Sequence, residues 1–481
     1  MSDRFPARPG PAADVAEAFA RVVEAALARA AGAPDAAAFH RAPPGAFDAL
    51  PALGPTGRPV EQVAQELLDR VLPYAMSTDH RRFFAFIPSP ASPLSWLGEL
   101  LTAVHNAHAG AAVQSEGATA IERRLISFLC KAAGLPSGAG GLFVSGGSMA
   151  NLTALTAARD RLLGEDEREL GVAYLGEGAH ASIAKALRII GVADRRVRIV
   201  ASDRLGRLDA GDLTAAVAAD RAAGLRPFVV VATAGATNTG AIDPLDAVAD
   251  VCAAERLWMH VDGAYGASAL LSPAHRGLLR GIGRADSLTW DAHKWLFQTY
   301  GCGAVLVRDR SALADAFRMG ADYLRDGDAP DGEPNAWDLG PELTRPARAT
   351  KLWLTLQTLG LDAVGAAIAR GIAAAETAER AVRATPDWRI VSEARLAIVC
   401  FRYAPPGVAE AEADALNRAI AKAMLEDGFA VVGATRVEGR AAIRMCTINP
   451  ATTDEDLSGT VDRLDAFARA LLPAFRLQAT G

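Results

Sequence analysis

Lys294 has an unusual setting for a lysine, because it follows His293 directly and lies between Trp290 and Trp295. An ammonium group usually stays in solvent, since its burial costs free energy unless it is paired or neutralised. The apolar run Ser287–Trp290 predicts a buried strand that ends near this lysine. A buried amine tends to lose its proton and become a nucleophile, which is the reactivity that Schiff-base chemistry needs. A lone lysine is far more often a solvated surface group, so the interpretation depends on the rest of the chain.

A glycine turn that opens a predicted helix is the second candidate feature. The segment Ser145-Gly-Gly147-Ser148 precedes a helix predicted for Met149–Leu163. Free N–H groups and the helix dipole suit a phosphate there, and the Ser148 hydroxyl could add a donor. Ser148 could equally be a simple N-cap. The segment matches neither GxGxxG nor the Walker pattern, so nucleotide-binding motifs are not supported.

Two polar residues follow other predicted strands. His180 comes after the strand Val172–Tyr174, where an imidazole could stack on a flat heteroaromatic ring or simply cap a helix. Asp262 ends another strand and could hold a protonated pyridine nitrogen, although such an aspartate is as often a helix cap or a metal ligand. Thr237 could donate a hydrogen bond to a cofactor oxygen or to this aspartate. No single feature is specific, whereas the ordered set is.

The elements that must position these residues alternate between strands and helices from about residue 95 to 310. This alternation predicts an α/β fold with a mostly parallel sheet, covered by helices on both faces, and such sheets bind ligands at the carboxyl ends of their strands. The predicted strands are Gly141–Ser145, Val172–Tyr174, Val197–Val200, Phe228–Thr233, Trp258–Val261, Ser287–Trp290 and Ala304–Val307. Further predicted helices are Ile183–Ile190, Asp209–Ala223 and Leu245–Glu255.

The chain divides into three predicted parts. Residues 1–90 form an N-terminal helical arm, residues 91–375 a large domain, and residues 376–481 a small α/β domain. The arm contains two helices, Ala13–Ala31 and Val60–Met76. A loop, Met319–Thr344, and a long helix, Ala347–Arg383, follow the strand–helix alternation. The small domain contains a strand, a helix and a strand, at Trp388–Tyr403, Ala411–Gly428 and Ala442–Ile448.

Composition excludes several classes of protein. The net charge of −6 leaves no basic footprint for nucleic acid. Five cysteines lie far apart without a CxxC pair, so neither a structural zinc site nor a disulfide framework is expected, and we predict no metal site. Neither a secretory signal nor an apolar stretch long enough to span a membrane is apparent. We therefore expect a soluble cytoplasmic protein.

The ordered set of residues resembles the group II pyridoxal-phosphate-dependent amino acid decarboxylases over about residues 60–450. The strongest likeness is Asp-x-Ala-Tyr at 262–265, followed by His-Lys-Trp at 293–295. The resemblance implies a fold-type I (aspartate aminotransferase-like) enzyme with a large cofactor-binding domain. It also implies pyridoxal 5'-phosphate as cofactor, α-decarboxylation of an L-amino acid to the amine and CO₂, and an obligate homodimer with shared active sites.

The resemblance implies roles for individual residues. Lys294, His180 and Asp262 are expected to be catalytic: the lysine binds the cofactor, the histidine stacks on its ring, and the aspartate pairs with the ring nitrogen. The cofactor-binding set is completed by Gly147, Ser148, Thr237, Ala264, Asp291 and His293, with Asp291 standing where the family often has asparagine. Ser89 lies where the family contacts the substrate carboxylate.

Two departures concern the reaction and the substrate. Many members carry, on the loop after the lysine strand, a tyrosine that protonates Cα, but residues 324–350 contain neither Tyr nor Phe. His180, water or Tyr323 could supply the proton, or the enzyme could release an aldehyde by oxidative deamination, as aldehyde synthases do. The segment Asn106–Val113 has mostly small side chains, whereas Phe86 and Trp295 offer an apolar wall. We expect an aromatic or bulky hydrophobic L-amino acid.

A pyridoxal-phosphate-dependent aminotransferase is a further alternative. It would share the lysine and the aspartate, and it would need an arginine to bind the α-carboxylate. Arg395, Arg402 and Arg444 are the candidates for that arginine. The His-Lys-Trp context favours the decarboxylase.

Overall fold

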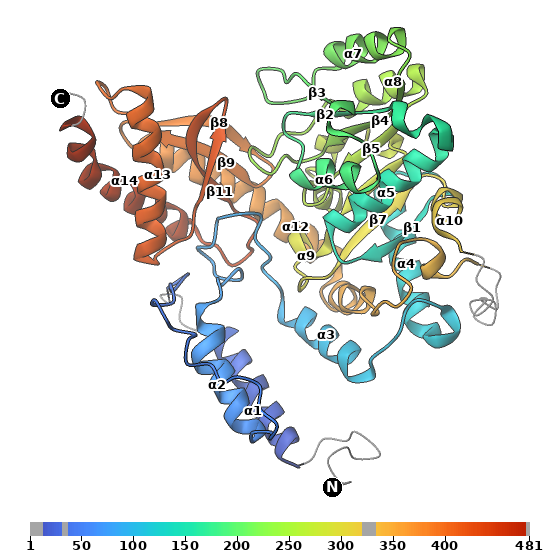
Figure 1. The fold of residues 1–481 in the computed structure, drawn as a ribbon. Coiled ribbons are helices and arrows are strands. Elements are labelled where there is room, and N and C mark those ends of the chain that lie inside the picture. Colours follow the sequence, from blue (N-terminus) through green and yellow to red (C-terminus); the bar gives the residue numbers. More distant parts are fainter. Residues whose placement is uncertain (1–12, 31–36, 320–332, 478–481) are drawn as a thin grey trace.

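The computed structural model describes residues 13–30, 37–319 and 333–477. Figure 1 shows three parts in chain order: a helical arm, a large α/β domain, and a smaller domain at the C-terminal end. The predicted boundary after residue 375 falls inside the helix α12 (Ala349–Ala384), which contacts elements of both domains. The division at residues 90 and 375 stays a prediction.

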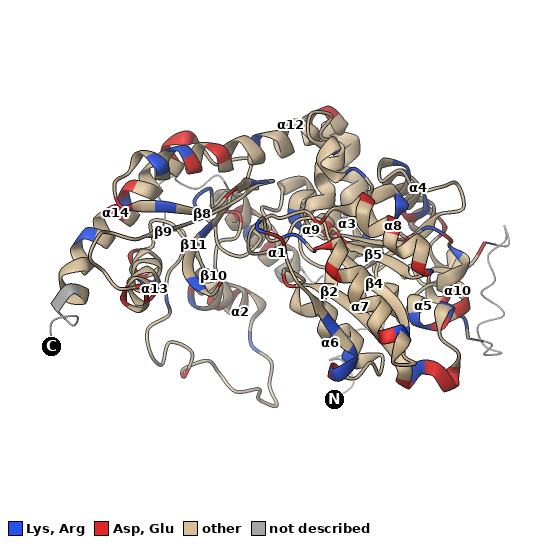
Figure 2. Cartoon of the chain, turned by 90° about the horizontal axis from the view of Figure 1, so that it is seen from above, with Lys and Arg blue, Asp and Glu red and all other residues tan. Residues whose placement is uncertain are grey.

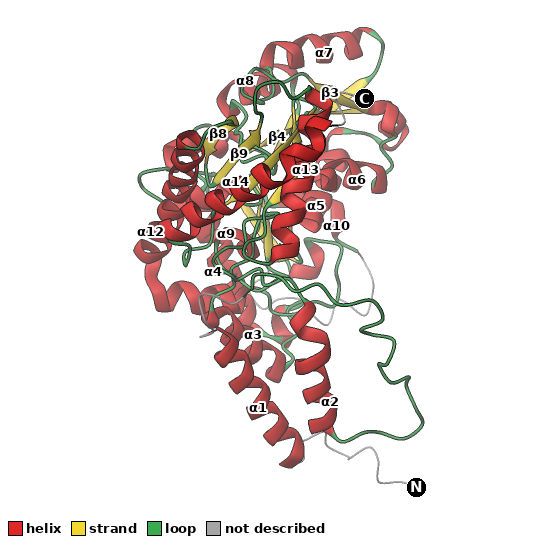
Figure 3. Ribbon diagram, turned by 90° about the vertical axis from the view of Figure 1, so that its left-hand side faces the viewer, coloured by secondary structure: helices red, strands yellow, loops and turns green. Residues whose placement is uncertain are grey.

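The arm is built from α1 (Ala13–Ala30) and α2 (Val60–Glu66), which lie side by side and project from the rest of the chain (Figures 1 and 3). The helical path of α2 continues through a π turn, Leu67–Val71, and a 3₁₀ turn, Leu72–Tyr74. Both helices predicted for this region are confirmed. A third helix, α3 (Pro93–His105), was not predicted; it begins with an N-cap serine and a proline, which are signals for a helix start.

The large domain contains a seven-stranded sheet in the order β1-β7-β6-β5-β4-β2-β3. Only β7 runs antiparallel to its neighbours, so the prediction of a mostly parallel α/β sheet is confirmed. The carboxyl ends of the other strands therefore meet at one edge. The strands are β1 (Gly140–Val144), β2 (Gly171–Gly176), β3 (Val197–Val200), β4 (Arg226–Thr233), β5 (Trp258–Asp262), β6 (Ser287–Trp290) and β7 (Gly303–Val307).

Helices cover both faces of this sheet, so the central strands bury side chains on both faces. In β4, Val229 and Val231 belong to one apolar cluster, and Val230 and Ala232 to the other. The first face packs against α5 (Gly147–Leu162), α6 (Ala181–Ile189) and α10 (Ser311–Phe317). The second packs against α4 (Glu116–Ala132), α7 (Ala210–Ala222) and α8 (Leu245–Glu255).

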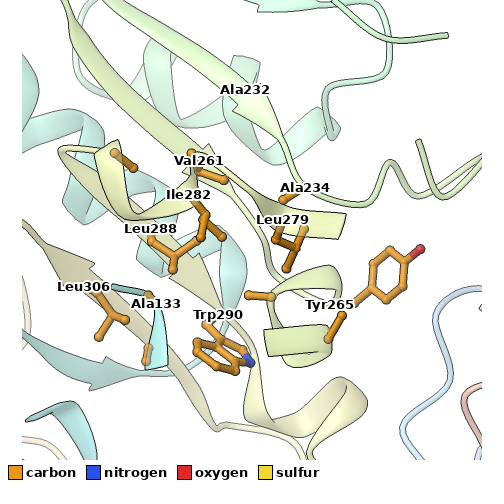
Figure 4. Close-up of a cluster of buried hydrophobic side chains, with 14 of the residues drawn as sticks. Ala133, Ala232, Ala234, Val261, Tyr265, Leu279, Ile282, Leu288, Trp290 and Leu306 are labelled. Atoms are coloured by element: carbon orange, nitrogen blue, oxygen red, sulfur yellow. The ribbon is translucent and has the colours of Figure 1, made fainter. Parts of the chain in front are cut away.

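The second cluster extends under the strand that precedes Lys294. Figure 4 shows Trp290 beside Leu288 and Leu306, with Tyr265 at the other side of the cluster. The indole nitrogen of Trp290 donates to Ser268 Oγ at 3.0 Å, so its only polar atom is paired in the core. The aromatic side chain before Lys294 is therefore structural.

The helix α12 is long and apolar enough to cross a membrane by length and composition alone. It packs against α3, α14 (Asp454–Leu477) and β8 (Trp388–Arg395). Its path bends at Gly360, whose φ of 76° is readily adopted only without a Cβ.

The small domain is a four-stranded antiparallel sheet in the order β10-β11-β9-β8, packed on α13 (Glu410–Asp427) and α14. The segment Trp388–Tyr403 was predicted as one strand, but it forms a hairpin of β8 and β9 (Ile398–Tyr403). The turn needs Leu396 at a φ of 50°, a conformation that no glycine announces in the sequence. The remaining strands are β10 (Gly433–Val437) and β11 (Arg440–Cys446).

Charged residues of both signs are interspersed over the outer helices (Figure 2). Pairs such as Arg188–Asp194 and Arg284–Asp250 are exposed, and pairs of this kind contribute little to stability. Arg345 differs, because its guanidinium is fully buried and donates to both carboxylate oxygens of Glu122, at 2.9 and 2.7 Å.

We predict that Arg345→Met lowers the free energy of unfolding by about 3–5 kcal/mol, because it leaves the Glu122 carboxylate buried without its partner. Urea denaturation followed by circular dichroism measures this. The matched control, Arg188→Met, breaks an ion pair whose side chains are 72% and 73% exposed, and we expect a change below about 1 kcal/mol. Equal losses in the two variants would contradict a structural role for the buried pair.

Candidate active site

A cavity of about 430 Å³ lies at the carboxyl edge of the large sheet. Its walls come from the segments that follow β1, β2, β4, β5 and β6, as expected for ligands of open parallel sheets. The cavity brings together every residue predicted to bind the cofactor: Gly147, Ser148, His180, Thr237, Asp262, Ala264, Asp291, His293 and Lys294.

The predicted strand Ser287–Trp290 is confirmed as β6, and Lys294 lies in α9 (Ala292–Trp295), the short helix that follows it. Its side chain is 25% exposed, and Nζ lies 3.1 Å from Asp291 Oδ2. The helical turn lifts the amine off the sheet edge, whereas Trp290 and Trp295 are buried in the core. The aromatic neighbours therefore pack the helix in place, and a carboxylate is the partner of the amine.

The N-terminus of α5 forms one wall of the cavity and has little room for side chains. A Cβ on Gly147 would lie 2.8 Å from Asp291 Oδ2, and one on Gly146 would lie 2.7 Å from His293 Cε1. The first N–H groups of a helix have no partner within it, so this turn suits an anion that approaches the backbone closely. The exposed Ser148 adds a hydroxyl at the same place.

Two buried polar atoms beside this turn have no hydrogen-bond partner among the described residues: Asp291 Oδ1 and His293 Nδ1. Burial lowers the pKa of His293, against the opposing effect of the Asp291 carboxylate. Unpaired buried polar atoms cost free energy unless a ligand or water satisfies them. A phosphate group fits His293, which can donate to it, whereas an ionised Asp291 can only accept, unlike the asparagine often found at this position in the family that the sequence resembles.

Asp262 closes the deepest wall at the end of β5 and is 7% exposed. Its Oδ2 accepts a hydrogen bond from Asn151 Nδ2 at 3.1 Å, and its Oδ1 accepts one from Ala264 N at 3.1 Å. These two donors hold the carboxylate in place at the cavity. Such a carboxylate can bind a cationic ring nitrogen in the cavity.

His180 is the exposed N-cap of α6. Its Nδ1 lies 2.8 Å from Ser182 Oγ and accepts a hydrogen bond from Ser182 N at 3.2 Å. The helix-cap interpretation is confirmed; the histidine also lines the cavity, and its stacking on a ligand stays a prediction. Its imidazole can cover a flat ligand.

The structure corrects two of the predicted substrate residues. Trp295 is fully buried and stacks on Tyr265, with ring centroids 5.7 Å apart, so it cannot offer a wall to a substrate. Ser89 is also buried, and its hydroxyl donates to the carbonyl of His293 at 2.5 Å, so it stabilises the segment that carries Lys294. Phe86 is 63% exposed at a φ of 52°, and its predicted contact with the substrate stays a prediction.

The arginines proposed for an aminotransferase do not line the cavity. Arg402 pairs with Glu410 and Asp414 within the small domain, and Arg395 donates to the carbonyl of Leu205. Arg444 donates to the carbonyls of Phe86 at 2.8 Å and Thr237 at 2.6 Å, so it ties two loops together. The described residues thus offer no free arginine for an α-carboxylate at the cavity.

Sequence reasoning missed two further cavity residues. Tyr300 is 63% exposed, and its ring centroid lies 5.5 Å from that of His293. Asn151 is buried one turn beyond Ser148 on α5 and reaches Asp262. The signal for Asn151 was a lone amide on a helix face of alanines and leucines. Tyr323, a predicted candidate for the proton donor, lies outside the described residues.

Comparisons with known proteins agree with this geometry. Residues 50–404 match the model of the pyridoxal-dependent decarboxylase conserved domain. An aromatic-L-amino-acid decarboxylase of Bacillus atrophaeus is 40% identical over 81% of this chain and 82% of its own length. An L-2,4-diaminobutyrate decarboxylase of Rhizobium meliloti is 35% identical over 89% of this chain and 86% of its own.

The fold is also similar to that of solved enzymes. The crystal structure of Oryza sativa TDC with PLP and tryptamine superimposes with a TM-score of 0.92 at 29% identity. The match covers 96% of this chain and 99% of that one. On these matches, the chain belongs to the pyridoxal-dependent decarboxylase family and is a pyridoxal-phosphate-dependent amino acid decarboxylase.

Proposed function

We propose that this enzyme removes the α-carboxylate of an aromatic or bulky hydrophobic L-amino acid as CO₂ and releases the amine. The observation that carries the proposal is the convergence of Lys294, Asp262, His180 and the N-terminus of α5, from four separate segments, on one cavity. The name of the Bacillus atrophaeus relative supports the aromatic class. Phe86 is exposed, and we propose that its ring contacts the side chain of such a substrate.

Each residue of the cavity has a proposed task. Bound pyridoxal phosphate supplies an electron sink for the bond that breaks. Lys294 Nζ binds the aldehyde of the cofactor, and Asp262 holds a proton at its ring nitrogen. His293, Ser148 and the turn at Gly147 bind the phosphate, and His180 lies against the ring.

The remaining predicted cofactor residues, Thr237, Ala264 and Asp291, complete the proposed binding site. The first two line the cavity near Asp262, and Asp291 pairs with Lys294. Asp291 thus gives the free amine a partner while no aldehyde is attached to it. The α-carboxylate contact predicted for Ser89 is dropped, since that hydroxyl is already bonded to the lysine segment.

Oxidative deamination to an aldehyde is the second candidate function. The observation that favours it is the absence of Tyr and Phe from residues 324–350, where many members carry the proton donor. A relative from Arabidopsis thaliana named phenylacetaldehyde synthase is 30% identical over 82% of this chain. Tyr300 offers the amine pathway an alternative hydroxyl at the cavity.

A homodimer and a cytoplasmic location are proposed as well. Large apolar side chains are exposed along the arm and α3, including Phe19 at 49%, Leu27 at 54% and Val104 at 70%, and such a surface favours association. All five cysteines are free and buried, which fits a reducing compartment.

We predict that Lys294→Ala abolishes the visible absorbance of lysine-bound cofactor and lowers the decarboxylation rate by on the order of 10³ or more. The matched control is Lys351→Gln, since Lys351 is also buried but its Nζ is bonded to Glu99, Thr299 and the carbonyl of Tyr300. Absorbance spectra of both purified variants with added cofactor measure this. A Lys294→Ala protein that keeps the absorbance would refute the assignment of the lysine.

We predict that a panel of L-amino acids, including L-2,4-diaminobutyrate, gives CO₂ and amine in equal amounts, with aromatic substrates turned over fastest. CO₂, amine, aldehyde and peroxide are measured in the same reactions. Aldehyde and peroxide in amounts equal to CO₂ would replace the main proposal by the second candidate. A keto acid without CO₂ would contradict both.

We predict that the enzyme has twice the mass of its 50.1 kDa chain in solution. Replacing Phe19 and Leu27 together by Glu places charges on the exposed face of α1, so we expect dissociation and loss of activity. Light scattering after size-exclusion chromatography measures the mass. A fully active wild-type monomer would overturn the dimer.

A further inference from the structure

Asn151 connects the two cofactor-facing residues Asp262 and His180. It is 1% exposed on α5, and its amide takes part in four hydrogen bonds. Nδ2 donates to Asp262 Oδ2 at 3.1 Å and to Ser182 Oγ at 3.0 Å. Oδ1 accepts from Thr289 Oγ1 at 2.6 Å and lies 3.0 Å from His260 Nε2. Its hydrogen-bonding groups are therefore fully used.

The chemistry of these partners permits only one orientation of the amide. An ionised carboxylate accepts hydrogen bonds and cannot donate them, so the NH₂ group must face Asp262. The reverse orientation would place the amide oxygen against the carboxylate. The amide oxygen therefore faces His260, and His260 must carry its hydrogen on Nε2 in order to donate to it.

The other nitrogen of His260, Nδ1, accepts a hydrogen bond, so the chain of donors continues beyond His260. Burial lowers the pKa of His260 well below its ordinary value, so the ring is neutral and Nδ1 is an acceptor. Nδ1 lies 2.8 Å from Ser287 Oγ, which itself accepts from Trp258 Nε1 at 2.7 Å. Donation thus runs from Trp258 through Ser287 and His260 to Asn151, and ends on Asp262. Hydrogen bonds in such a chain polarise one another toward the final acceptor.

A second branch leads from Asn151 to His180. The oxygen of Ser182 accepts from Asn151, so the Ser182 hydroxyl hydrogen is directed to His180 Nδ1, 2.8 Å away. The backbone N–H of Ser182 also donates to this nitrogen, at 3.2 Å. Because Nδ1 is an acceptor for both, the hydrogen of a neutral His180 resides on Nε2.

We propose that Asn151 is a positioning residue that sets both cofactor-facing groups at once. It fixes Asp262 as the acceptor for the ring nitrogen of the cofactor, and it fixes His180 as the Nε2–H tautomer. This inference rests on the proposed function, in which Asp262 and His180 face the cofactor ring. An aspartate at position 151 would accept from the Ser182 hydroxyl and so remove this donor from His180 Nδ1, which would then accept only from the backbone N–H of Ser182.

The first test separates positioning from general stability by using a ratio. Apo-protein is titrated with pyridoxal phosphate and with the analogue that has CH in place of the ring nitrogen. The ratio is the dissociation constant of the analogue divided by that of pyridoxal phosphate. The wild type is expected to bind the analogue more weakly, because the analogue cannot pair with Asp262. In Asn151→Asp this ratio falls toward one, by about tenfold or more. An unchanged ratio would overturn the proposal.

Matched variants guard against misfolding. Asn417→Asp alters another buried asparagine, 1% exposed and bonded to the backbone of Tyr403 in the small domain, and it is expected to keep the wild-type ratio. Ser182→Ala breaks only the His180 branch and keeps the ratio as well. If Asn151→Asp does not fold, Thr289→Val removes one donor to the amide oxygen and is expected to lower the ratio in the same direction. No decrease in Thr289→Val would then refute the relay.

The second test measures the tautomer of His180 directly. Ring ¹⁵N spectra of histidine-labelled protein, with His180 assigned by its loss in His180→Phe, are expected to show the Nε2–H form in the wild type. In Asn151→Asp the fraction of the Nδ1–H form is expected to rise, because the backbone N–H of Ser182 is then the one remaining donor to Nδ1. A wild-type Nδ1–H form would overturn this arm. Neither test requires turnover, so a protein that decarboxylates no amino acid would refute the proposed function while the relay stands.

Discussion

The parallel pairing of β4, β5 and β6 is the constraint on which the site depends. It sets Asp262 opposite Thr233 on one side and Thr289 on the other, so the carboxylate and the segment that carries Lys294 leave the same edge of the sheet. A single-residue slip in this register would turn Asp262 toward the opposite face. The apolar clusters hold the register, because β4 and β5 bury apolar side chains toward both sets of helices, and β6 buries Leu288 and Trp290 in the second cluster.

Many polar groups deep in the large domain are hydrogen-bonded to one another. The hydrogen-bond chain from Trp258 to Asp262 links β5, β6 and α5. Glu122, Arg345 and the backbone N–H of Phe143 form a second buried network. Buried networks of this kind are stabilising only when every member is paired. Asp291 Oδ1 and His293 Nδ1 are among the buried polar atoms that have no hydrogen-bond partner in the described residues, and they lie where a ligand phosphate can approach the N-terminus of α5.

The sheet and the helices of the arm could be predicted, because strand and helix periodicity are local signals. The residues predicted from the family resemblance to face the cofactor meet at one cavity, and their roles stay proposals. The structure differs where tertiary packing decides. Trp295 and Ser89 were predicted to contact substrate, but the turn of α9 buries the indole and draws the hydroxyl of Ser89 to the carbonyl of His293. The hairpin at Leu396 and the contacts of Asn151 depend on partners distant in sequence, so no local pattern indicated them.

The attachment of the cofactor to Lys294 is the central claim, and mass spectrometry after borohydride reduction of the holoenzyme tests it most directly. Reduction makes the bond between cofactor and lysine permanent, so the modified peptide identifies the lysine. The account predicts the added cofactor mass on the peptide that contains Lys294 and an unmodified Lys351, whose amine is already bonded to Glu99. Label on another lysine, or a fully active enzyme without label, would contradict it.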